Sequence, residues 1–201
     1  MNEEIDGPKE NIAFLKSLVG DGSAAKRDAA MLLAVGLIFG SLDFLYWLMF
    51  AGLVDWPPAT RNGLALAAIG AFALSLGRVL RTTPSPKSPA ARAAGTALAG
   101  VGLALIAAEL AFFAAGRAIH LPQLPLWTLP IMLFTLYGAA WSVVFVVRRR
   151  AWYGAIAAGC YVTAFLCGLS MSAPTEWLAL SLGTFALVAA PGAVMWRETR
   201  E

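Results

Sequence analysis

Two acidic residues, Asp43 and Glu109, lie within long apolar stretches of the sequence. An ionised carboxylate at the centre of a lipid bilayer costs roughly 2.5–3.5 kcal/mol, so such a group either finds a partner or holds a proton. One hypothesis is that the two acids form a binding site for protons or a cation. The alternative is that they are buried polar groups that fix helix packing. Hydroxyl groups available to Asp43 are those of Tyr46, Ser75, Tyr137 and Ser142.

Other residue types that catalyse reactions or bind metals are sparse. The one histidine, His120, lies in an expected loop, and Cys160 and Cys167 are seven residues apart on one expected helix. Seven helical residues place the two Cα atoms about 10 Å apart, which is too far for a disulfide. The sequence has no histidine pair for haem, no H-E-x-x-H motif and no phosphate-binding glycine loop. We therefore expect no catalytic residue, metal site or cofactor.

The apolar stretches that surround the two acids are long enough to be transmembrane helices. Hydrophobic residues make up 59% of the 201 residues and charged residues 13%, whereas a soluble domain has about 25% charged residues. A helix needs about 20 apolar residues to cross a bilayer. We expect an all-α polytopic membrane bundle with six transmembrane helices. They cover residues 31–54, 63–80, 93–116, 127–147, 152–170 and 175–196.

Basic residues are distributed unequally between the two sides of these spans. Thirteen of the 15 Lys and Arg residues fall on one side, and only Arg61 and Arg117 fall on the other. Because positively charged loops stay in the cytoplasm, we expect both termini to be cytoplasmic, in a bacterial-type inner (plasma) membrane. Aromatic rings favour the headgroup level, and Trp56, Trp127 and Trp177 fall at the expected outer boundary.

The predicted organisation is a short terminal segment followed by one membrane domain. Residues 1–28 are expected to be a cytoplasmic N-terminal segment with a short amphipathic helix over 8–19, where apolar residues recur on one face. Residues 29–201 are expected to be the six-span domain. The basic residues stand in short clusters between apolar runs, a pattern typical of cytoplasmic membrane loops, so no nucleic-acid partner is expected.

Small residues mark two helix faces that should contact other helices. The first span contains Gly36 and Gly40 in a GxxxG pair, and the third contains Gly95 and Gly102; each stripe also includes the acid of its span. Lipid tails are as apolar as leucine, so helices in a bilayer associate through close contact at small residues. We expect the stripes of the first and third spans to face each other.

One further break lies inside the last span, at Pro191-Gly192. Proline there should kink the helix, which makes the pair a hinge candidate. A kink that is static and fits a neighbouring helix is the alternative.

Two functions follow from these features. The first is a non-enzymatic accessory, assembly or regulatory protein that docks through Gly/Ala helix faces onto other membrane-protein helices or a second copy of itself. The alternative is a small transporter or channel that moves protons, a cation or a small solute through Asp43 and Glu109. A solute pathway usually has more intramembrane polar residues than these, which favours the first function. The lipid bilayer is the expected environment in both.

Overall fold

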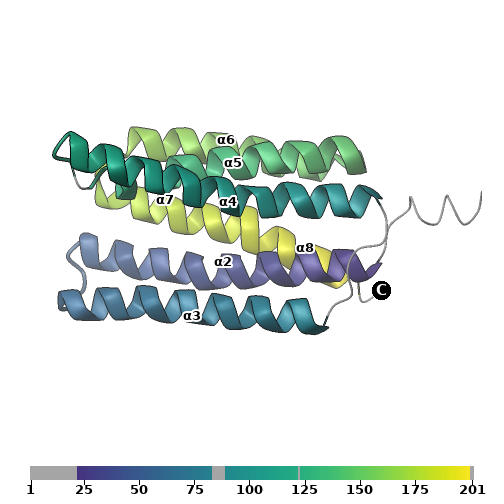
Figure 1. Ribbon diagram of the computed structural model, residues 1–201, viewed down its shortest axis with the longest axis horizontal. Coiled ribbons are helices and arrows are strands. Elements are labelled where there is room, and N and C mark those ends of the chain that lie inside the picture. The colour runs from purple at the N-terminus through teal and green to yellow at the C-terminus, as the bar shows by residue number, and fades with distance from the viewer. Residues whose placement is uncertain (1–21, 83–88, 122, 200–201) are drawn as a thin grey trace, which may run out of the picture.

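The computed structural model describes residues 22–82, 89–121 and 123–199, which form an all-α bundle (Figure 1). Its helices are α2 (Gly22–Phe50), α3 (Pro58–Thr82), α4 (Pro89–Ala118), α5 (Leu124–Arg148), α6 (Ala151–Leu169), α7 (Pro174–Thr184), the π-helical turn η1 (Phe185–Ala189) and α8 (Ala190–Glu198). The segments α7, η1 and α8 are consecutive and form one span. The described residues thus contain six helices long and apolar enough to cross a membrane. The prediction of an all-α fold with six candidate spans is confirmed.

Proline and glycine mark several helix ends. Proline opens three helices, at Pro58, Pro89 and Pro174, where its missing N–H costs no helical hydrogen bond. The first span ends at Phe50, earlier than its predicted end at position 54. Gly52 has a φ of 71°, and the N–H of Leu53 donates to the carbonyl of Leu48 at 2.9 Å. Gly52 thus ends the helix and turns the chain before the apolar residues of this segment end.

The spans are not equally buried. α2 packs against α3 and against the last span, whereas α4 packs against α5, and α5 against α6 (Figure 1). In the most apolar 18-residue stretch of the last span 50% of residues are buried, compared with 6% in α3 and 6% in α4. The largest buried side chains come from α5, α6 and the last span, and include Trp141, Tyr153, Phe134, Leu180 and Val188. The core therefore lies among these three spans, and α3 and α4 are peripheral.

The last span changes its helical form near its middle. In η1 the hydrogen bonds reach one residue further than in an α-helix, and the N–H of Ala190 donates to the carbonyl of Phe185. Pro191 follows directly and has no N–H to donate to the preceding turn. A regular α-helix would lack one backbone hydrogen bond at this proline. The wider turn lies where that bond would be missing.

The hinge candidate Pro191-Gly192 lies just after this turn and is buried. A Cβ atom built on Gly192 would lie 2.7 Å from the backbone nitrogen of Leu33 and 3.1 Å from the carbonyl oxygen of Ala29. The glycine therefore lets the last span approach the backbone of α2 closely. In this arrangement the pair fits a neighbouring helix, and movement at it stays a prediction.

Both ends of the described chain lie at one end of the bundle, as an even number of spans requires. Nζ of Lys26 in α2 lies 5.6 Å from the ring centroid of Trp196 in α8. The opposite end, formed by residues 51–57, 119–121, 123 and 170–173, is called the predicted outer end below. The membrane side that each end faces stays a prediction. The amphipathic helix expected over 8–19 lies outside the described residues, and residues 22–28 belong to α2.

Candidate functional site

The GxxxG pair of the first span packs against the last span. A Cβ on Gly36 would lie 2.4 Å from the backbone nitrogen of Ala189, and a Cβ on Gly40 would lie 3.1 Å from the ring of Phe185. The hydroxyl of Ser181 donates to the carbonyl of Gly40 at 2.9 Å. Close backbone approach and an interhelical hydrogen bond are the two main means by which helices associate in a bilayer. These glycines thus join α2 to α7 and η1.

The expectation that the first and third spans pack stripe to stripe is wrong, because α2 makes only a slight contact with α4. A Cβ on Gly102 would meet no atom within 4 Å, and one on Gly95 would come no closer than 3.9 Å to Asp28. Ile106 and Phe113, on the same stripe, are 61% and 52% exposed. Most of the third-span stripe therefore faces away from the other residues that the structure describes.

Asp43 is buried, at 8% exposure, one turn from the hydrogen bond between Ser181 and Gly40. It lies within electrostatic range of the Cys167 thiol at the end of α6. None of the expected hydroxyl groups forms a hydrogen bond with it in the part of the chain that the structure describes. Two of them bond elsewhere: Tyr46 donates to the carbonyl of Arg61 at 3.3 Å, and Ser142 to that of Gly138 at 2.8 Å.

Glu109 lies on α4, and its Oε1 atom is buried without a hydrogen-bond partner among the described residues. The structure gives no interaction between Glu109 and Asp43, and the helices that carry them barely touch. Neither acid lines either of the two cavities described below. The two candidate residues are therefore not brought together into one site.

A third acid, Glu176, is more buried than either of these. It stands in the first turn of α7 and is 2% exposed. Its Oε2 atom accepts a hydrogen bond from the N–H of Ser172 at 2.9 Å, while its Oε1 atom is buried and unpartnered within the described chain. Sequence reasoning missed it because it stands at the edge of a span. The local signal was its place three residues into a helix, where a carboxylate reaches back to free N–H groups.

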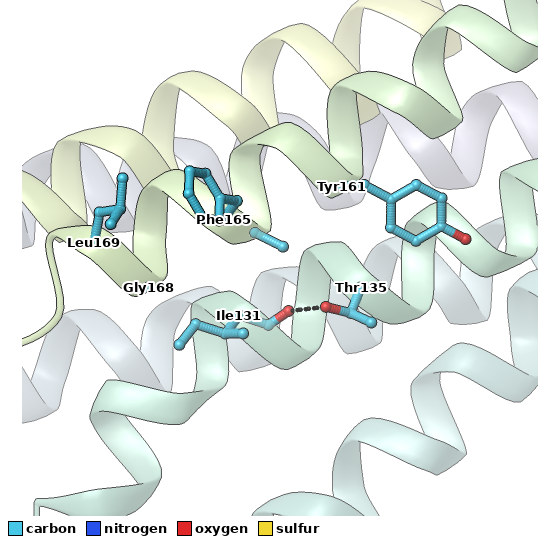
Figure 2. Close-up of a pocket in the computed structure, with 7 residues that line it drawn as sticks. Ile131, Thr135, Tyr161, Phe165, Gly168 and Leu169 are labelled. Carbon is cyan, nitrogen blue, oxygen red and sulfur yellow. Dashed lines mark hydrogen bonds between the residues drawn. The ribbon is translucent and has the colours of Figure 1, made fainter.

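The first of two cavities is an apolar groove of about 480 Å³ between α5 and α6 (Figure 2). The hydroxyl of Thr135 in this groove donates to the carbonyl of Ile131 at 2.7 Å, so it is already satisfied. The hydroxyl of Tyr161 lies 3.4 Å from that of Ser142. A groove with satisfied polar groups and apolar walls suits a lipid chain better than a polar solute. Its lining residues are Ile131, Thr135, Tyr161, Ala164, Phe165, Gly168 and Leu169.

The second cavity has a volume of about 320 Å³ and lies at the predicted outer end. It is bounded by the end of α2, the start of α5 and the start of α7, and one of its walls is Glu176. The other lining residues are Phe50, Gln123, Leu126, Trp127, Ser172, Ala173, Pro174 and Trp177. This cavity therefore combines one buried acid with several aromatic rings.

The remaining residues with ligand chemistry are dispersed. His120 is exposed in the turn after α4, and Cys160 and Cys167 are free and buried on α6. Within residues 22–82, 89–121 and 123–199, no three His, Cys, Asp or Glu side chains are grouped so that they could hold a metal ion.

Comparisons of the chain with models of protein families, with curated proteins and with solved structures find no match. Its assignment therefore rests on its own helices. Six of them have the length and composition of membrane spans. By that criterion the chain is a multi-pass membrane protein.

Proposed function

We propose that this chain is a non-enzymatic subunit of a membrane assembly, and that it docks onto a transmembrane helix of a partner protein through one face of α3. This face, the α3 face below, consists of Gly63, Ala67, Gly70, Leu74 and Gly77. Its three glycines recur every seven residues, which places them on the same side of a helix. The observation that carries the proposal is that a Cβ atom on any of the three would meet nothing within 4 Å.

Exposed glycines in a membrane helix call for a physical reason. Glycine in the middle of a helix is less favourable than alanine by about 0.5–1 kcal/mol. At Gly36 and Gly192 close contact within the chain accounts for glycine, but the α3 face makes no such contact. Lipid tails gain nothing from a smooth groove, whereas a second helix can approach it closely. A partner helix therefore accounts for all three glycines at once.

The position of α3 also supports docking. It lies at the edge of the bundle, with α2 as its main neighbour (Figure 1). Leu74 on the α3 face is 78% exposed. On α4, a Cβ atom on Gly100 or Gly102 would also meet nothing within 4 Å, but these two glycines lie on different sides of their helix and form no common face. Ion transport through Asp43 and Glu109 lacks comparable support, because the two acids lie beside no common cavity among those described.

The orientation belongs to the same proposal. The excess of basic residues at the end that carries Lys26 and Trp196 supports a cytoplasmic location for both termini in a bacterial-type inner membrane. With that orientation, the predicted outer end faces away from the cytoplasm.

Purification in mild detergent tests the docking role when wild type is compared with Gly70→Leu and Ala158→Leu. Leucine at position 70 adds bulk to the α3 face at a site where a Cβ atom meets nothing within 4 Å, and it raises helix propensity. Ala158 is exposed on α6, away from α3. We expect a stoichiometric partner with wild type and with Ala158→Leu, and its loss with Gly70→Leu at a thermal stability equal to or above that of wild type. Retention of the partner by Gly70→Leu, or its absence from wild type, contradicts the proposal.

A further inference from the structure

The 320 Å³ cavity at the predicted outer end, called the Glu176 cavity below, has the features of a binding site. Its volume is near the lower end of the range of about 300–1,000 Å³ typical of small-molecule pockets. Three separate spans contribute to it, through Phe50 of α2, Trp127 of α5 and both Glu176 and Trp177 of α7. The cavity therefore exists only in the folded bundle, and its volume limits it to a small ligand or a small part of a larger one.

The Glu176 carboxyl group supplies an unused hydrogen-bond acceptor. Its residue is 2% exposed, and its Oε1 atom has no partner among the described residues. Leaving such a group unsatisfied costs about 1–3 kcal/mol. The ion pairs of the described chain are Arg148 with Asp28 and Arg150 with Glu198, both near the opposite end of the bundle. No basic side chain of the described residues therefore neutralises this acid.

Aromatic rings form the wall beside this carboxyl group. The rings of Phe50 and Trp177 are stacked, with centroids 5.4 Å apart and planes at 15°. The ring of Tyr46 meets Trp177 edge-on at 5.1 Å, which holds the indole in place. Trp127 lines the cavity from α5. Aromatic faces attract cations, and several rings around an alkylated ammonium group are a common recognition arrangement.

The chemistry of the lining selects among cations. Calcium takes about six to eight oxygen ligands and magnesium about six, whereas the polar side chains that line the Glu176 cavity are those of Glu176, Gln123 and Ser172. Ordered water needs only about two to four polar partners, so it would leave the rings of Phe50, Trp127 and Trp177 unused. An organic ammonium group uses both parts of the lining, since its charge matches the carboxylate and its carbon atoms match the rings.

We propose that the Glu176 cavity binds an alkylammonium group, carried either by a small soluble amine or by a phospholipid headgroup. The ammonium charge lies against Oε1 of Glu176, and the alkyl substituents contact Trp127 and Trp177. Both sources fit the position of the cavity, because tryptophans at the end of a span lie at the headgroup level.

Binding to the purified full-length protein tests this inference. Choline and ethanolamine are titrated into protein in phosphatidylglycerol nanodiscs, with binding followed by calorimetry. A second arm uses nanodiscs that contain equal amounts of phosphatidylglycerol and phosphatidylethanolamine, with retained lipid identified by native mass spectrometry. Saturable binding of a soluble amine identifies a soluble ligand, and selective retention of phosphatidylethanolamine identifies a headgroup. No selective binding in either arm overturns the proposal.

Three variants assign the binding to this cavity. Glu176→Gln keeps the acceptor for the Ser172 N–H and removes the charge, so it should weaken binding at least about tenfold. Trp127→Leu keeps an apolar wall and removes a ring, so it should weaken binding about threefold or more. Glu198→Gln, at the opposite end, should bind like wild type. Thermal unfolding shows which variants are folded. Wild-type affinity in a folded Glu176→Gln or Trp127→Leu protein contradicts the assignment.

Discussion

Replacement of Gly36 by alanine tests the packing of α2 against the last span. The added Cβ would lie 2.4 Å from the backbone nitrogen of Ala189 and 2.6 Å from its Cα. Ordinary contacts are about 3.5–4.0 Å long, so the two helices must separate by about 1 Å. The opposing atoms belong to the backbone and cannot rotate away. The separation would also weaken the hydrogen bond from Ser181 to Gly40. Overpacking of this kind costs about 1–3 kcal/mol.

Gly70→Ala is the matched control for this prediction. A Cβ at position 70 meets nothing within 4 Å. Both variants gain the same helix propensity, about 0.8–1.0 kcal/mol, so the difference between them isolates the steric term. We expect Gly36→Ala to be less stable than Gly70→Ala by about 1–3 kcal/mol. Unfolding by SDS in mixed micelles, followed by tryptophan fluorescence, measures this difference. Equal stability of the two variants would refute the close approach of α2 and η1.

Three further substitutions test individual polar groups by the same unfolding assay. Ser181→Ala removes the buried hydrogen bond to Gly40 and should destabilise the protein by about 0.5–1.5 kcal/mol; an unchanged midpoint would count against that bond. Thr184→Val removes a buried hydroxyl without a partner among the described residues, so we expect stability equal to or above wild type, and a clear loss would reveal an unrecognised partner. Tyr153→Phe removes the hydroxyl that accepts a hydrogen bond from Arg148 at 3.0 Å, and it should lower the free energy of unfolding by about 0.5–1.5 kcal/mol. Because Tyr153 is buried, this loss should change little with salt concentration.

The six spans could be predicted because their signal is local. Each needs only a long apolar run and a break, and proline or glycine near the ends supplies the break. Helix termination at Gly52 was harder to place, because apolar residues continue through Leu53 and Val54 after the helix ends. The hydrogen bonds that close a helix depend on backbone conformation as well as on hydropathy.

The pairing of helices could not be predicted in the same way. Gly36 and Gly40 identify a close-packing face, but small residues occur in every span, and the sequence does not say which of them lies opposite. The matching surface is supplied by Phe185 and Ala189, which lie at positions remote in sequence. Contact between distant segments, and not the composition of either one, determines the neighbour.

The candidate site was missed for a related reason. Glu176 follows Pro174 at a helix start, a position that is often exposed to solvent. The cavity that it lines is completed by Phe50 and Trp127, which come from two other spans. Asp43 and Glu109 were found because each stands within an apolar run, yet this local feature says nothing about whether they meet.

Photo-crosslinking from the α3 face in native membranes tests the docking role most directly. Benzoylphenylalanine replaces Leu74, which is 78% exposed on that face, or Val162, which is 57% exposed on α6 and serves as the control. We predict one discrete protein adduct from position 74, none from position 162, and loss of the adduct when Gly70→Leu is added. Lipid adducts alone from position 74, or the same protein adduct from both positions, would contradict docking through α3.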